Sequence, residues 1–171
     1  MFRQYEKKKK ERKKFDFDDM LVQCYALFQK RPDILKAWQE RFRYILIDEF
    51  QDINRVQYEV IRMIAAPEYN LFVVGDDDQS IYGFRGAKPE LMLYMKQEFP
   101  NIRQIPLTTN YRSTEFIVGA ASRVILHNES RFYKRVQSSK GKGESVHVQE
   151  VLDENEESRY VAVEIQKHLD L

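Results

Sequence analysis

The sequence of 171 residues is poor in the residue types that build disulfide frameworks and zinc sites. Cys24 is its single cysteine, so no internal disulfide can form, and a reducing cytoplasm is the compartment that this composition favours. The three histidines, His127, His147 and His168, are scattered and no second cysteine joins them. The composition therefore argues against a disulfide-stabilised domain and against a Cys/His zinc module.

Long hydrophobic runs are also absent from the sequence. No apolar run approaches the roughly 20 residues that span a bilayer, and no apolar signal-peptide core follows the charged N-terminus. Hydrophobic residues make up 43% of the chain and aromatic residues 13%, which is enough for a packed core. We therefore expect a cytoplasmic globular protein without a membrane partner, folded as one domain or as two small lobes.

The near-neutral net charge of +1 hides an asymmetry along the chain. Residues 1–14 carry eight basic and two acidic side chains, whereas the rest of the chain carries 20 basic and 25 acidic ones. A basic arm, predicted to be helical, thus leads an acidic body. The arm has two interpretations that stay open: a surface that follows nucleic-acid phosphates, or the solvated face of a helix.

Helical periodicity and capping residues predict several helices. Asp16 is the expected N-cap of a helix whose apolar residues recur at helical spacing as far as Phe28. Pro32 suits the first turn of the next helix. Further helices are predicted over residues 56–65, near residues 89–99, after an N-cap at Ser113, and after a capping pair of Asp153 and Glu156.

Two short apolar runs, Tyr44–Ile47 and Leu71–Val74, have the character of buried strands. Because a helix is predicted between them, they indicate a parallel sheet covered by helices on both faces. Acidic residues follow each run, at 48–49 and at 76–78. Ligands of such sheets bind beyond the carboxyl ends of the strands, so both acidic clusters fall where a site is expected. Further strands are predicted over residues 103–107 and 146–152.

Asp48 and Glu49 leave the first predicted strand within the segment Asp-Glu-Phe-Gln-Asp. Nucleotide hydrolysis needs one carboxylate to hold Mg²⁺ and another to orient or deprotonate water. Adjacent residues that leave a strand can divide these roles, because their side chains point in different directions. The pair by itself also fits a solvated turn, so this motif does not decide the function.

Residues 75–86 crowd three acids, Gln79, two aromatic residues and Arg85 around three glycines. Three consecutive carboxylates repel one another unless a cation, an arginine or a helix N-terminus compensates their charge. Tyr82 and Phe84, two residues apart, suit stacking on unpaired bases, and core packing is the alternative for each. A third segment, Asn-Tyr-Arg-Ser at 110–113, carries an arginine suited to a transferring phosphoryl group.

In their order and spacing, the segments at 48–52, 73–87 and 110–113 resemble the superfamily 1 DNA helicases of the UvrD/Rep/PcrA type. The resemblance runs from about Phe15 to Val136. It implies an α/β fold: a RecA-like parallel sheet flanked by helices, incomplete, with part of a second RecA-like lobe. The implied domains are a basic helix returning from an inserted accessory subdomain (1–14), the second part of the first ATPase lobe (15–105) and the first part of the second lobe (106–171).

The same resemblance implies roles around ATP. Asp48 is expected to bind Mg²⁺, and Glu49 to activate the attacking water. Gln79 is similar to the residue that senses the γ-phosphate. Arg85 and Arg112 resemble two arginines that reach the γ-phosphate, the second of them from the other lobe. The implied cofactors are therefore ATP and Mg²⁺.

The remaining roles concern the base and the DNA. Tyr111 resembles the aromatic residue that stacks on adenine, whereas Tyr82 and Phe84 resemble residues that contact single-stranded DNA. Ile53 stands where relatives often have threonine, so a hydroxyl contact is not expected there. The implied function is ATP-dependent movement on single-stranded DNA and unwinding of duplex DNA.

The chain has no Gly-x-x-x-x-Gly-Lys-Ser/Thr loop to cradle phosphates, because none of its six glycines fits this pattern. Lys142 follows Gly141, but Gly143 stands where the pattern needs serine or threonine. The family places that loop ahead of the region seen here. We therefore expect the chain to be a fragment that hydrolyses ATP poorly or not at all by itself. Two alternatives stay open: a non-catalytic single-strand DNA-binding or scaffold remnant, and a subunit of a helicase-nuclease complex.

Overall fold

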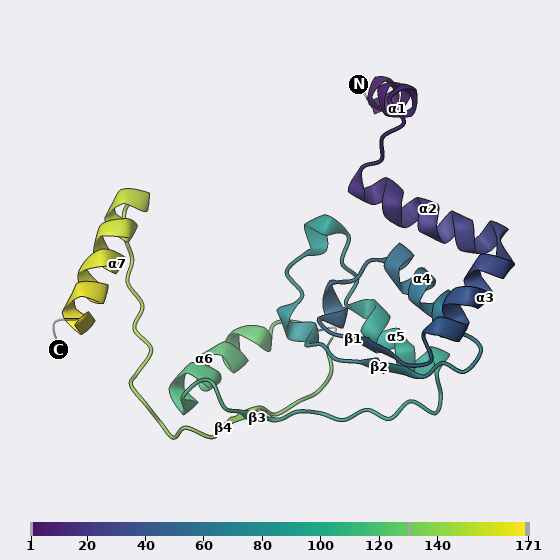
Figure 1. Ribbon diagram of the computed structural model, residues 1–171. Helices are drawn as coiled ribbons and strands as arrows, with labels where there is room; N and C mark the ends of the chain where they lie inside the picture. Colours follow the sequence, from purple (N-terminus) through teal and green to yellow (C-terminus); the bar gives the residue numbers. More distant parts are fainter. Residues whose placement is uncertain (1, 130, 170–171) are drawn as a thin grey trace. The chain divides into compact units, whose positions relative to one another are not determined.

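The computed structural model describes residues 2–129 and 131–169, apart from the side chain of Arg85, and divides the chain into two units (Figure 1). The first unit comprises the chain up to Pro106 together with Asn128–Lys134. The second comprises Leu107–His127 and the chain from Arg135. Each unit combines helices with a short parallel sheet, which confirms the expected α/β class. Among the helices described, none is both long and apolar enough to cross a membrane.

Capping residues set the starts of the helices in the first unit. Asp16 and Asp19 form a capping box at the start of one helix, and Pro32 occupies the first turn of the next, both as predicted. Asn54 and Gln57 form a second capping box. In chain order the elements are α1 (Phe2–Glu11), α2 (Phe17–Lys30), α3 (Pro32–Arg41), β1 (Ile45–Ile47), the 3₁₀ helix η1 (Phe50–Asp52), α4 (Arg55–Ala65), β2 (Leu71–Val73), the 3₁₀ helices η2 (Asp77–Gln79) and η3 (Gly83–Arg85), and α5 (Glu90–Glu98).

The strands β1 and β2 pair in parallel, with Ile45 opposite Leu71 and Ile47 opposite Val73. The helix α4 connects them, so the three elements form a βαβ unit. The hydrogen-bond ladder continues past the strands, because the Val74 N–H donates to the Ile47 carbonyl at 2.8 Å. The two strand ends, and the acidic residues that follow them, are thereby held side by side.

The core of the first unit lies between one face of this sheet and the helices α4 and α5. Its buried cluster consists of Phe50, Tyr58, Leu91 and Met95. The rings of Phe50 and Tyr58 meet edge to face, with centroids 6.1 Å apart. Phe50 is fully buried and follows the acidic pair directly, so core packing fixes the chain where it leaves β1.

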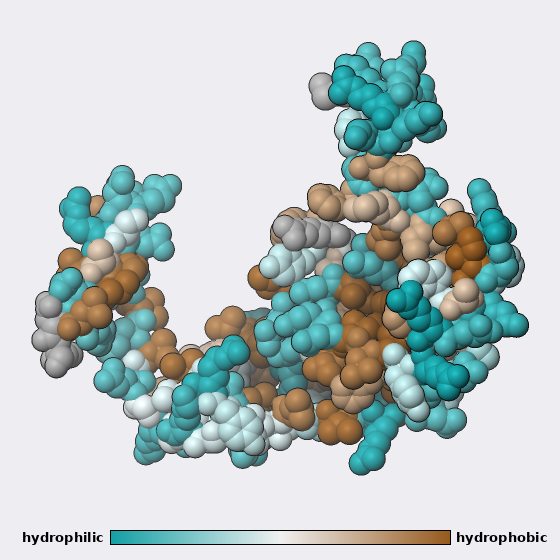
Figure 2. Space-filling view, viewed as in Figure 1, coloured by the Kyte–Doolittle hydropathy of each residue, from teal (hydrophilic) through white to brown (hydrophobic). Residues whose placement is uncertain are grey.

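The other face of the sheet is uncovered within the residues that the structure describes. Leu46 and Phe72 lie opposite each other on that face and are 73% and 57% exposed. Figure 2 shows hydrophobic residues in the part of the first unit where Figure 1 draws β1 and β2. The expectation of helices on both faces is therefore wrong here, because α4 and α5 both direct their buried residues to the face that carries Ile47.

The second unit contains a second βαβ arrangement. Its elements are β3 (Thr109–Asn110), α6 (Glu115–Ile125), β4 (Gln137–Ser138) and α7 (Glu154–Leu169). The strands β3 and β4 pair in parallel, and α6 connects them. The helix α7 starts as predicted, since the Asp153 carboxylate accepts a hydrogen bond from the Glu156 N–H at 2.8 Å.

Three sequence predictions for the second half of the chain are wrong. Residues 103–107 and 146–152 form no strand, because pairing occurs instead between 109–110 and 137–138, and a strand needs a hydrogen-bonding neighbour. The N-cap of α6 is Thr114 and not Ser113. Its side chain makes no capping bond, since the Glu115 and Phe116 N–H groups donate to the carbonyls of residues 141 and 142.

Candidate active site

The chain changes direction sharply where it leaves β1. Glu49 has left-handed backbone angles, φ 49° and ψ 42°, which cost a residue other than glycine about 1–3 kcal/mol and concentrate at functional sites. The Asp48 carboxylate accepts a hydrogen bond from the Glu49 N–H at 2.9 Å. Both side chains are exposed, so the end of β1 presents two adjacent carboxylates to solvent.

A buried amide links this turn to the end of β2. Gln51 is 1% exposed, and its Nε2 donates to Oε2 of Glu49 at 2.7 Å. Its Oε1 accepts a hydrogen bond from the Asp76 N–H at 3.0 Å. The role of Gln51 was not predicted from the sequence. A glutamine two residues after Glu49 is equally common in an exposed turn, so its position in the sequence does not indicate burial.

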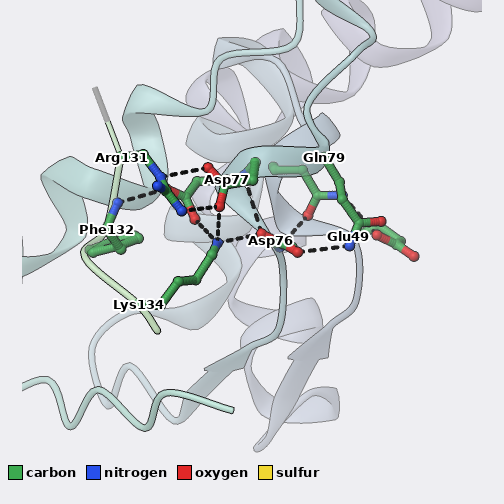
Figure 3. Close-up of polar contacts among 9 residues, drawn as sticks. Glu49, Asp76, Asp77, Gln79, Arg131, Phe132 and Lys134 are labelled. Carbon is green, nitrogen blue, oxygen red and sulfur yellow. Dashed lines mark hydrogen bonds and ion pairs between the residues drawn. The ribbon is translucent and has the colours of Figure 1, made fainter. Parts of the chain in front are cut away.

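Gln79 lies at the end of η2 and is joined to the same network. Its Nε2 donates to Oδ2 of Asp76 at 2.7 Å, and the other oxygen of that carboxylate accepts from the Asp78 N–H at 3.2 Å. Figure 3 shows Asp76 at the centre of the site, with Gln79 and Glu49 to its right. The structure thus connects Glu49 to Gln79 through Gln51 and Asp76.

The three acids that follow β2 are compensated by two cations that the sequence analysis did not identify. The carboxylates of residues 76–78 lie within 4.8 Å of one another. Arg131 donates two hydrogen bonds to Asp78, at 2.9 and 2.6 Å, in the forked geometry that strengthens such pairs. The Lys134 ammonium contacts all three acids, at 2.6 Å for Asp77 and 3.0 Å for Asp78. A cation of the protein therefore lies where a metal would have to bind these carboxylates (Figure 3).

These ion pairs change the pKa values of their members. Burial opposes the charge of Asp76, but hydrogen bonds from Lys134 and Gln79 outweigh it and lower the pKa of Asp76. Burial likewise opposes the charge of Lys134, but its three acidic partners raise the pKa of Lys134. The charged form of Asp76 therefore stabilises the fold above about pH 4, the ordinary pKa of an aspartate. The charged form of Lys134 stabilises the fold below about pH 10, the ordinary pKa of a lysine. The contribution is lost as the pH falls through the pKa of Asp76 or rises through that of Lys134.

The second unit carries two of the predicted contacts to the nucleotide. The Asn110 side chain accepts hydrogen bonds from the Arg112 N–H at 2.9 Å and from the Ser113 N–H at 2.7 Å. This turn begins at the end of β3 and leaves the side chains of Tyr111 and Arg112 exposed. Asp48, Glu49 and Gln79 belong to the first unit, so the predicted site residues are divided between the two units.

The aromatic pair lies at the start of η3. The rings of Tyr82 and Phe84 have centroids 5.9 Å apart and planes inclined at 47°. Both residues are exposed, which argues against core packing as their main role. Arg85 belongs to η3, and its side chain lies outside the described part of the chain.

One lysine of the basic arm has a structural role. Lys9 forms ion pairs at 2.7–2.9 Å with Glu6, Asp16 and Asp19, and so ties α1 to the N-terminus of α2. The other basic residues of the arm are exposed, so both interpretations of the arm stay open for them.

The backbone at Gly75 lies close to Phe50 and Gln51, and this close contact lets the ends of β1 and β2 exchange hydrogen bonds. A Cβ at this position would lie 2.6 Å from Oε1 of Gln51 and 3.2 Å from the backbone nitrogen of Phe50. We expect Gly75→Ala to displace the Gln51 amide and to lower the free energy of unfolding by about 1–3 kcal/mol, measured by urea unfolding. Gly119→Ala is the control, because Gly119 lies in α6 with open space around it and should lose nothing. Equal stability of the two variants would contradict this close packing.

Comparisons with known proteins identify the family of the chain. The family model for the UvrD/REP helicase N-terminal domain matches residues 1–100, and the model for the UvrD-like helicase C-terminal domain matches residues 105–170. The chain is 46% identical over 169 residues to the YjcD protein of Bacillus subtilis, whose name describes a candidate ATP-dependent DNA helicase; this covers 99% of the chain and 22% of that protein.

Helicases named PcrA are similar over nearly the same region. The chain is 39% identical over 164 residues to the ATP-dependent DNA helicase PcrA of Staphylococcus aureus, covering 96% of the chain and 22% of that protein. For PcrA of Staphylococcus epidermidis the identity is 38% over 168 residues, covering 98% and 23%. The chain therefore spans less than a quarter of the length of these relatives. With one family model matched over residues 1–100 and a second over residues 105–170, the chain belongs to the UvrD/REP helicase family.

Proposed function

We propose that the chain is part of the motor of an ATP-dependent DNA helicase, which couples ATP hydrolysis to movement on single-stranded DNA and to duplex unwinding. The observation that carries this proposal is that hydrogen bonds connect the residues that follow β1 to the residues that follow β2. There, buried Gln51 holds the exposed Glu49 carboxylate to the loop that bears Gln79. Membership in the helicase family and the names of the relatives support the proposal.

The proposed roles at the hydrolysis site follow from this arrangement. The exposed Asp48 carboxylate offers the hard oxygen donor that Mg²⁺ takes, and Mg²⁺ supplies charge neutralisation on nucleotide phosphates when bound. Glu49 would orient or deprotonate the attacking water. Gln79 would sense the γ-phosphate, because its amide is held by Asp76 on the same network as Glu49.

The remaining residues would bind the adenine base of ATP, stabilise the charge that develops on the γ-phosphate, and bind DNA. Tyr111 would stack on adenine, and Arg85 and Arg112 would stabilise charge on the γ-phosphate. The exposed rings of Tyr82 and Phe84 would stack on unpaired bases, an interaction that tolerates any sequence and so suits a motor. Single-stranded and duplex DNA are the proposed partners, and a reducing cytoplasm is the proposed compartment.

The proposed division of the chain follows the family resemblance. Residues 1–14 would return from an accessory subdomain, residues 15–105 would belong to the first RecA-like lobe, and residues 106–171 would begin the second. The change of unit between Pro106 and Leu107 supports this division.

ATP hydrolysis by the full-length product of the gene that encodes this chain tests the proposal. We expect Mg²⁺-dependent hydrolysis that single-stranded DNA stimulates at least about tenfold. The 171 residues by themselves should show no such activity, because the sequence has no phosphate-cradling loop. Binding of single strands without any response to nucleotide would contradict the proposal and favour the non-catalytic remnant.

A further inference from the structure

We infer that Arg131 and Lys134 are positioning residues of the hydrolysis site, which hold the acidic loop, residues 76–79, in the arrangement that fixes both Gln79 and Glu49. This inference rests on the proposed function for the roles of Gln79 and Glu49. The contacts of Arg131 and Lys134 are independent of those roles.

The acidic loop needs positive charge to keep its conformation. Three adjacent carboxylates repel one another, and the Asp77 side chain is only 2% exposed, so water cannot screen its charge. Arg131 and Lys134 bring two positive charges against these three negative ones. The Phe132 N–H adds a hydrogen bond to Asp77 at 2.7 Å. Removing either cation would leave a crowded group of acids with too little compensation.

An unbroken series of hydrogen bonds runs from Lys134 to both proposed catalytic side chains (Figure 3). Lys134 binds one oxygen of the Asp76 carboxylate, and Gln79 donates to the other oxygen at 2.7 Å. The Asp76 backbone N–H donates to Gln51, which in turn donates to Glu49. A change in the position of Asp76 would therefore move Gln79 and Glu49 together.

The two cations come from a segment far away in the sequence. Asn128–Lys134 belongs to the first unit, although the chain before and after it belongs to the second. Its ion pairs with the acidic loop tie this segment to the first unit. Because these ion pairs join the acidic loop to a distant part of the chain, they restrict the position of the loop more than a pair with a sequence neighbour would.

Hydrogen exchange in the full-length gene product tests the positioning without any reference to ATP. In Lys134→Met, amides of residues 76–80 should exchange at least about tenfold faster, whereas amides of β2 should be unchanged. Lys134→Arg should restore slow exchange, because it keeps the charge. Lys140→Met, which removes an exposed lysine that lies after β4 in the second unit, is the control. Arg131→Gln is a second variant if Lys134→Met does not fold.

Unchanged exchange at residues 76–80 in folded Lys134→Met or Arg131→Gln would overturn the inference.

Steady-state ATP hydrolysis then tests the connection to catalysis. Lys134→Met should lower kcat about tenfold or more while changing KM for ATP less than about threefold. In the double variant with Gln79→Ala, the loss should be smaller than the product of the two single losses, because part of the effect of Lys134 passes through Gln79 and the rest passes through Gln51 to Glu49. Losses that multiply would show an independent role and overturn the inference. Faster exchange in Lys134→Met, in a protein whose wild type lacks DNA-stimulated hydrolysis, would instead support the positioning of the acidic loop by Lys134 and contradict the proposed function.

Discussion

Glu49→Gln is expected to lower kcat for DNA-stimulated ATP hydrolysis about 10²- to 10⁴-fold in the full-length gene product. The substitution removes a general base but keeps an oxygen that can accept the hydrogen bond from Gln51. The turn after β1 should therefore keep its shape, and the affinity for ATP should change less than about threefold. Hydrolysis rates and binding of a fluorescent ATP analogue measure the two quantities separately.

Glu68→Gln is the matched control for this experiment. Glu68 is exposed and lies between α4 and β2, away from the carboxyl ends of the strands. Its replacement should leave both kcat and ATP affinity unchanged. A Glu49→Gln protein that keeps more than about a tenth of the wild-type kcat would contradict the role proposed for Glu49.

Phe50→Ala is expected to lower the free energy of unfolding by about 3–5 kcal/mol, the largest effect on stability that we anticipate from one substitution. Phe50 is fully buried and its ring packs edge to face on Tyr58, so truncation leaves a cavity in the core of the first unit. Urea unfolding followed by far-UV circular dichroism measures the loss. Phe50 directly follows Glu49, so the loss of packing falls next to the turn that presents Glu49.

Phe17→Ala serves as the control for Phe50→Ala, because Phe17 is the most N-terminal residue of α2 and is largely exposed. Its loss should stay below about 1 kcal/mol. A loss for Phe50→Ala no larger than that for Phe17→Ala would contradict the burial of Phe50 in the core of the first unit.

The acidic ends of β1 and β2 were predictable from the sequence because their signals are local. An apolar run of strand length followed at once by carboxylates needs no knowledge of distant residues. Pairing of the two strands, which the alternation with α4 implied, then places Asp48 and Glu49 beside Asp76 and Gln79. Capping at Asp16 and at Asp153 was predictable for the same reason.

The contacts that organise the site were not predictable, because they join residues far apart in the chain. Gln51 meets Asp76 across 25 positions, and Lys134 meets it across 58. The sequence analysis did indicate that three adjacent carboxylates need compensation, but it could not say which of 28 lysines and arginines supplies it. The strand expected at 146–152 is absent for a related reason, because the local sequence of a segment does not specify a pairing partner.

The dependence of ATP turnover on strand length is the most direct test of the proposal that this chain belongs to a motor that moves along single-stranded DNA. A motor that stays bound while it moves hydrolyses more ATP per encounter on a longer strand. We expect kcat of the full-length gene product to rise with oligonucleotide length well beyond the contacted segment and then to level off. A kcat that is constant once the strand fills the binding site, or hydrolysis that ignores DNA altogether, would contradict it.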